Sequence, residues 1–277
     1  MVTSVVDATH ELAAFLRSRR ERLNPQDLGL PMRRAIRRTP GLRREEVAEI
    51  AGVSTDYIVR LEQGRGLRPS AEVVEALAGA LRLSPAERAY LYDLARQRPR
   101  GADKPATTAA PPLARMVSDL SPLPAMLMNH RFDILAWNPE MARLLTDFGE
   151  LPPVQRNAMW VCLMHPEVSA FYVDRDRVVR DAIANLRGAW AAHPEDRMLT
   201  DLIGELTSAH NEFARLWAAQ DVSGGGRGQK VIRHPQAGEI AMHFEVFMPM
   251  QETDQRLMIG RAADDVSQSA LDRLVAR

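Results

Sequence analysis

The feature that most constrains this chain is a glycine turn between two short helical patterns, in the stretch RREEVAEIAGVSTDYIVRLEQGRG at residues 43–66. Gly52 permits a backbone with positive φ, and Ser54 is suited to cap the helix that follows. Val53 is placed to fill the angle between the two helices. This is a helix-turn-helix pattern, in which the second helix lies in the DNA major groove, although other small helical bundles also use Gly and Ser in their turns.

The same stretch raises an objection, because Asp56 stands at the leading end of the second helix and DNA is a polyanion. One interpretation is that Asp56 occupies the N2 position, where the helix dipole favours an anion by roughly 0.3–1 kcal/mol. The other is that Asp56 faces bases and accepts a hydrogen bond from cytosine N4. Both can hold together.

The surrounding sequence predicts further helices. Apolar residues recur at spacings of three and four in ELAAFLRSRRERL, and PSAEVVEALAGAL follows the second helix with Ser70 as an expected cap. In SPAERAYLYDLA, Ser84, Pro85 and Glu87 form a capping-box pattern. We therefore expect five helices between residues 10 and 96.

Residues 97–112, QRPRGADKPATTAAPP, have no periodicity and are predicted to be a linker. Residues 113–265 mix strand and helix patterns. Two short strands flank a turn near His130 and Arg131, helices follow, and three strands come last, in QKVIRHP, GEIAMHFEVFMP and RLMIGRA. This order predicts an α+β domain. The middle of the last three strands is expected to place Ile240, Met242, Phe244, Val246 and Met248 on one face. Residues 266–277 are expected to form a tail or a terminal helix.

Charge is unevenly distributed over the 277 residues. Residues 1–100 hold 18 arginines against 13 acidic residues, and the remainder holds 18 basic against 23 acidic residues. This asymmetry indicates one part that faces a polyanion and one that does not. Only Lys104 and Lys230 are lysines, so phosphate contacts would be made by guanidinium groups.

Neither a membrane span nor a secretory signal is expected, because apolar runs are short and the N-terminus has no basic region. The single cysteine, Cys162, excludes an intrachain disulfide, and a cytoplasmic location is the default expectation.

The longer string RRTPGLRREEVAEIAGVSTDYIVRLEQGRG closely resembles the XRE-type, lambda-repressor-like helix-turn-helix, and in particular that of bacterial MmyB-like transcription regulators. Past the linker, LAWNPEMARLL, FARLWAAQDV and VIRHPQAGEIAMHFEVF are similar to that family's C-terminal ligand-binding domain. The resemblance covers about residues 10–260. It implies an all-α helix-turn-helix domain followed by an α+β, PAS-like domain that binds an apolar small molecule, such as a fatty acid.

The resemblance also assigns residues to DNA. Thr55, Asp56 and Arg60 match base-facing positions, with Ser54 and Tyr57 on the same helix. A bidentate contact from arginine to guanine contributes roughly 1–3 kcal/mol of discrimination. Phosphate contacts are expected from Arg44 and Arg65. In one departure from the family, Arg43 stands where many XRE domains have a capping Thr, so that helix start must be capped by Thr39 or Glu46.

A basic loop precedes this helix, with four arginines in six residues and no acidic residue among them. Such a cluster is either a solvated surface loop or a contact to phosphates or the minor groove, and the mutual repulsion of its charges favours DNA. Its members are Arg33, Arg34, Arg37 and Arg38.

Methionines are concentrated in the apolar elements of the second domain, and their unbranched side chains suit a cavity of adaptable shape. Plain core packing is the alternative for each of them. The candidate lining residues are Met126, Met128, Trp137, Met141, Met159, Phe213, Trp217, Met242 and Phe244.

Enzymatic interpretations have little support. The histidines at 165, 193, 210, 234 and 243 show no metal-ligand spacing, and SGGGRGQK lacks the ending of a phosphate loop. We expect no cofactor and no metal, and Cys162 within MWVCLM is expected to be a buried, inert thiol.

The sequence therefore predicts a DNA-binding transcription regulator that acts as a homodimer, because one short recognition helix reads too few bases. Relief of repression by the ligand is the expected direction. Two alternatives stay open: a second domain that serves only dimerisation, and an enzyme domain fused to a DNA-binding domain.

Overall fold

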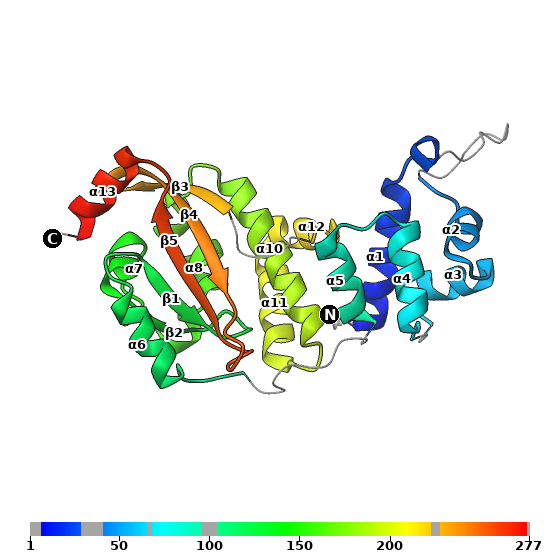
Figure 1. The fold of residues 1–277 in the computed structure, drawn as a ribbon, viewed down its shortest axis with the longest axis horizontal. Coiled ribbons are helices and arrows are strands. Elements are labelled where there is room, and N and C mark those ends of the chain that lie inside the picture. Colours follow the sequence, from blue (N-terminus) through cyan, green and yellow to red (C-terminus); the bar gives the residue numbers. More distant parts are fainter. Residues whose placement is uncertain (1–6, 29–40, 66–67, 96–104, 223–227, 276–277) are drawn as a thin grey trace. The chain divides into compact units, whose positions relative to one another are not determined.

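The computed structural model describes residues 7–28, 41–65, 68–95, 105–222 and 228–275 (Figure 1). Two compact units are distinguished by their internal contacts. The first comprises residues 1–100 together with 190–224, and the second comprises residues 101–189 together with 225–277. None of the described helices is long and apolar enough to cross a membrane.

The expected five helices are present in the first unit. They are α1 (Ala8–Arg22), α2 (Arg44–Ala51), α3 (Thr55–Glu62), α4 (Ala71–Ala80) and α5 (Pro85–Leu94), with a short 3-10 turn, η1, at Pro25–Leu28. Ser70 and Ser84 cap α4 and α5 as predicted, and Glu87 completes the capping box of α5.

The core of these helices forms around aromatic and aliphatic side chains that the periodicity placed on inner faces. Phe15 of α1 packs edge-on against Tyr90 of α5, with 5.0 Å between the ring centroids. Leu42, Val74 and Leu77 are also buried. Tyr90 donates a hydrogen bond to Glu11 at 2.8 Å, which satisfies its buried hydroxyl.

Two later helices, α11 (Arg197–Ala209) and α12 (Asn211–Ala218), belong to the first unit, and α10 (Arg175–Ala192) runs across the boundary between the units. Within the first unit, Arg19 of α1 is buried, pairs with Glu87 at 2.8 Å and donates to the carbonyl of Gln220, just after α12. Contacts therefore connect two segments about 200 residues apart in the sequence.

The second unit is built on a five-stranded antiparallel sheet with the order β2-β1-β5-β4-β3. Its strands are β1 (Ala125–Met128), β2 (Ile134–Trp137), β3 (Gly228–His234), β4 (Gly238–Phe247) and β5 (Arg256–Ala262). The predicted α+β class is confirmed. The order was not predicted, and it places the last strand of the chain beside the first.

The register divides the side chains between two faces. Residues directly opposite each other in an antiparallel pair point to the same side, and the direction alternates along each strand. One face contains Ala125, Leu127 and Leu257, which pack with Val117 of α6 (Pro111–Asp119). The sequence pattern does not predict α6, whose first two residues lie within the predicted linker.

The opposite face, which we call the methionine face, is defined by one residue from β2 and others from β1, β4 and β5: Met126, Trp137, Met242, Phe244 and Met258.

A glycine makes room on this face. Gly260 lies opposite Phe244, and a Cβ at that position would meet the side chain of Met242 at 3.0 Å and that of Phe244 at 3.1 Å. A side chain here would therefore compete with both for space. The expected position of Met248 on this face is wrong, because β4 ends at Phe247 and Met248 is exposed.

Shorter helices complete the second unit. They are α7 (Pro139–Leu144), α8 (Ala158–Met164), α9 (Val168–Phe171) and the terminal α13 (Asp265–Val275), with a 3-10 turn, η2, at Pro153–Gln155. The segment after α9 reaches the edge strand, where Tyr172 bridges to Ile232, and His234 of β3 hydrogen-bonds the carbonyl of Arg143 in α7 at 3.1 Å. In this way α7 and α9 are tied to β3.

Candidate nucleic-acid interface and ligand site

The turn before α3 has the geometry that its sequence predicts. Gly52 adopts φ 66° and ψ 31°, in the left-handed region, and ends α2. Its position is open, since a Cβ there would meet nothing within 4 Å, so the glycine is required by its backbone angle and not by space. Ser54 then caps α3, accepting a hydrogen bond from the backbone N–H of Tyr57 at 3.1 Å.

The side chains of α3 separate into an inner and an outer set. Ile58 and Leu61 are buried against the other helices, whereas Thr55, Asp56 and Arg60 are exposed. Asp56 lies in the first turn, two residues after the cap, as both interpretations of this carboxylate require. An outer set with a hydroxyl, a carboxylate and a guanidinium provides donors and acceptors for the major groove.

Tyr57 lies between these two sets. Its ring is half-buried, and burial raises the pKa of its phenol while the nearby charge of Arg60 opposes the rise. The phenol is therefore neutral at physiological pH and retains its hydroxyl as a donor.

Arg44 begins α2, and its guanidinium is held by an acidic residue that the sequence did not single out. Its Nε donates to Oε2 of Glu62 at 2.7 Å, and the side chain is 43% exposed. The carboxylate itself is only 2% exposed and also binds Nε and Nη2 of Arg20, at 2.5 and 3.1 Å. Glu62 thereby connects α1, α2 and α3 and orients Arg44 at the helix start.

Arg20 shows the strength of this arrangement. Burial alone would lower the pKa of its guanidinium, but the hydrogen bonds and charge of Glu62 raise that pKa overall. Arg20 also donates to the carbonyl of Leu42 at 2.8 Å, and Arg17 donates to the carbonyl of Glu62 at 2.9 Å. The signal in the sequence was the acidic residue within VRLEQG, because Glu62 is the last residue of α3 and lies on its buried side.

The start of α2 is capped by one of the two expected residues. The backbone N–H of Arg43 donates to Oε2 of Glu46 at 2.7 Å, and the other candidate, Thr39, lies outside the described residues. The four arginines of the basic loop, at positions 33, 34, 37 and 38, lie outside them as well. Arg65, just past α3, is exposed.

The candidate ligand residues are divided between the two units: seven lie in the second unit, and Phe213 and Trp217 lie in the first. Met126, Met128, Met242 and Phe244 are buried in the sheet, and Met141 of α7 and Met159 of α8 are buried in the same unit. Trp137 is half-buried and packs edge-on against Phe148, with 5.5 Å between the ring centroids.

Phe213 and Trp217 are not part of this group. Both lie on α12 in the first unit, where their rings stack with centroids 5.8 Å apart.

Cys162 of α8 is buried, and burial raises the pKa of its thiol, although Lys230, a hydrogen bond with Tyr172 and Arg175 oppose the rise. His130 pairs with Asp254 in a buried contact that sequence reasoning missed. Asp254 also accepts hydrogen bonds from the backbone N–H groups of Ala106 and His130, so the pair fastens the start of the unit to the turn before β5.

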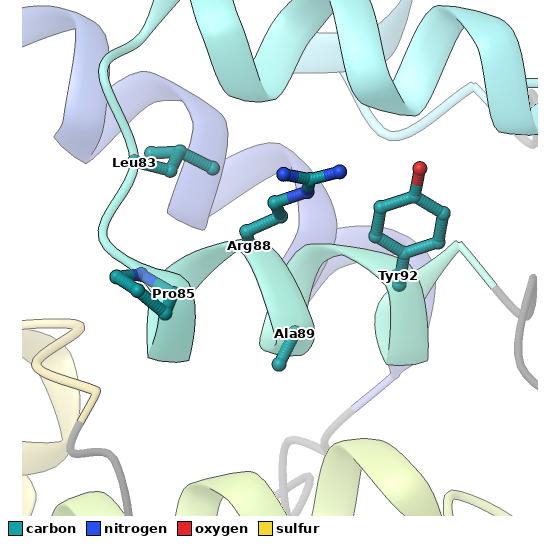
Figure 2. Close-up of a pocket in the computed structure, with 5 residues that line it drawn as sticks. All are labelled: Leu83, Pro85, Arg88, Ala89 and Tyr92. Atoms are coloured by element: carbon teal, nitrogen blue, oxygen red, sulfur yellow. The ribbon is translucent and has the colours of Figure 1, made fainter.

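A surface hollow lies on α5 and the turn before it (Figure 2), lined by Leu83, Pro85, Arg88, Ala89 and Tyr92. Arg88 pairs with Glu75 at 2.6 Å, and Tyr92 donates to the same carboxylate at 2.9 Å. Both polar side chains of the hollow therefore bind Glu75, and these contacts link α5 to α4.

Comparison with known families agrees with this geometry. The family model of the MmyB-like transcription regulator ligand binding domain matches residues 109–274, which is more than half of the chain. A helix-turn-helix domain model matches residues 11–91. No curated protein matches the chain in sequence. The chain therefore belongs to the MmyB-like transcription regulators, which combine a DNA-binding helix-turn-helix with a ligand-binding domain.

Proposed function

We propose that this regulator is a cytoplasmic repressor that binds operator DNA as a homodimer through α3 and is released by an apolar small molecule, such as a fatty acid, bound in its C-terminal domain. The observation that carries the proposal is the outer surface of α3. Thr55, Asp56 and Arg60 are all exposed there on a helix that Ser54 caps and Ile58 and Leu61 anchor.

In this proposal α3 enters the major groove and Arg60 reads guanine O6 and N7, while Asp56 accepts from cytosine N4. Arg44 and Arg65 contact phosphates on either side. The pairing of Arg44 with Glu62 supports this role, because a guanidinium with one face fixed to a buried carboxylate keeps its other N–H groups in a defined direction.

The methionine face supports an apolar ligand. It contains flexible thioether side chains and two aromatic rings, and Trp137 and Met258 are only half-buried. Such a surface adapts to a chain-like ligand more readily than one formed by branched residues.

Regulation requires the ligand to bind the two states of the dimer with different affinity. We propose that the ligand favours an arrangement in which the two α3 helices no longer match half-sites about one helical turn, or a multiple, apart. Repression is then relieved because the operator is bound by fewer contacts.

Anisotropy titrations with the promoter beside the protein's own gene test the DNA part, and native mass spectrometry of the purified protein tests the ligand part. A bound lipid that shifts the operator affinity supports the proposal. A dimer that never carries or responds to any apolar compound would assign the C-terminal domain to dimerisation alone.

A further inference from the structure

Arg19 of α1 is a buried cation in the first unit, at the point where the end of α12 contacts α1 and α5. The residue is 3% exposed, and its guanidinium lies over the ring of Phe15, 4.6 Å from the centroid. Its Nε lies 2.8 Å from Oε1 of Glu87 in α5, and its Nη2 donates to the carbonyl of Gln220. One side chain therefore connects three segments: α1, α5 and the end of α12.

Stability alone does not explain a buried arginine at this position. Burial lowers the pKa of the Arg19 guanidinium, and the charges of Glu87 and Asp221 offset this only in part. Replacing a buried ion pair by apolar side chains of similar volume is often neutral or stabilising, so the presence of the pair favours a role in specifying one arrangement. The arrangement that Arg19 specifies is the position of α12 against α1 and α5.

The end of α12 is a strained segment that this contact supports. Gln220 follows the helix with φ 59°, a left-handed conformation that is unfavourable for a residue other than glycine. Its side-chain Oε1 is buried and has no hydrogen-bond partner within the described part of the chain. Both features destabilise this end, whereas a cation beside the last carbonyls of a helix stabilises it. The guanidinium of Arg19 supplies that cation.

The order of the chain links this contact to the second unit. Residues 190–224 belong to the first unit, although the residues before them, 101–189, and after them, 225–277, form the second. The edge strand β3 begins at Gly228, shortly after Gln220. A movement of β3 would therefore act on the end of α12 through a short stretch of chain, and from there on α1 and α5.

We infer that Arg19 is a clamp that couples the DNA-binding helices to the second unit by holding the end of α12 against α1 and α5. The inference rests on the proposed regulation of a dimeric repressor and names the contact through which that regulation passes. With the clamp closed, α1 to α5 move together with α12, and each α3 keeps a defined direction in the dimer. With the clamp open, α3 stays folded but is no longer held to match a second half-site.

Hydrogen exchange of the full-length protein, followed by mass spectrometry, tests the clamp itself. In Arg19→Met, peptides covering α12 and its end should exchange about tenfold or more faster than in wild type, because a charge-assisted hydrogen bond is lost. Arg22→Met is the matched control. Arg22 binds the same Glu87 carboxylate at 2.8 Å from a side chain that is 51% exposed, and its removal leaves the bond from Arg19 to Gln220 in place. Equal exchange of α12 in the two variants overturns the clamp.

Arg19→Met should fold, because Glu87 retains two other donors. These are Arg22 and the backbone N–H of Ser84, each at 2.8 Å. Thermal unfolding checks that the variant is folded. Arg19→Lys keeps the charge and should recover part of the protection of α12, whereas a clamp that acts by packing alone would be restored equally well by methionine.

Operator spacing tests the coupling. Anisotropy titrations would compare the promoter beside the gene with a version in which about five base pairs, half a helical turn, are inserted between the half-sites located by footprinting. Wild type should bind the native spacing about tenfold or more tightly, because the insertion prevents both α3 helices from binding together. Arg19→Met should lose most of that preference, and Arg22→Met should keep it.

The two possible failures are distinct. An unchanged spacing preference in Arg19→Met overturns the coupling and leaves the proposed dimeric repressor standing. A wild type without any spacing preference overturns the proposed dimeric operator complex, and the exchange of α12 alone then decides the clamp.

Discussion

Removing the Glu62 carboxylate should destabilise the helix-turn-helix more than any single surface change. In Glu62→Gln, a neutral amide replaces an acceptor that binds Arg20 at 2.5 and 3.1 Å and Arg44 at 2.7 Å. The guanidinium of Arg20 stays buried and loses its counter-charge. Breaking a buried pair in this way costs about 3–5 kcal/mol, a large part of the total stability of a small domain.

Hydrogen exchange measured by mass spectrometry of peptides from α1 and α3 follows this change directly. The opening free energy of these peptides should fall by about 3–5 kcal/mol in Glu62→Gln. Glu239→Gln is the control, because its pair with Arg233 is exposed on both sides and should contribute less than about 1 kcal/mol. Unchanged protection of α3 in Glu62→Gln would refute the assignment of Glu62 as the tie between α1, α2 and α3.

Three further predictions concern other sites. Asp56→Ala should relax sequence preference in competition binding more than it weakens non-specific binding, and a loss of stability with unchanged preference would leave Asp56 as a dipole partner alone. Cys162 should resist a thiol reagent in the native protein and react on unfolding, because it is buried and its thiol pKa is raised; fast native labelling would contradict this. Burial would raise the pKa of Glu87, but Arg22, the Ser84 N–H and Arg19 lower it overall. The Glu87 carboxylate therefore contributes its full stabilisation of the fold above the pKa of an unfolded carboxyl group, and this stabilisation is lost as pH falls through its lower folded-state pKa. In urea titrations at several pH values, Glu87→Gln should make the free energy of unfolding depend less on pH on the acid side.

Local rules in the sequence were enough to predict the five helices α1 to α5. Ser54, Ser70 and Ser84 cap their helices because capping depends on a few neighbouring residues, and the left-handed Gly52 follows from the same local chemistry. The strands after residue 225 were also predicted, since period-two alternation is local.

What could not be predicted depends on contacts between distant residues. The pairing of β1 with β5 joins positions about 130 residues apart, and the role of Glu62 requires Arg20, some 40 residues earlier. The assignment of Phe213 and Trp217 to the sheet's cavity assumed that apolar residues of one sequence domain share one core. The contacts of α12 place both in the first unit instead.

The most direct test of the account is the effect of Arg60→Ala on operator recognition. Fluorescence anisotropy would compare full-length wild type and variant on the promoter beside the gene and on a scrambled duplex at matched salt. The account predicts that Arg60→Ala loses roughly 1–3 kcal/mol on the promoter and little on the scrambled duplex. A variant that binds the promoter as tightly as wild type would contradict the placement of α3 in the major groove.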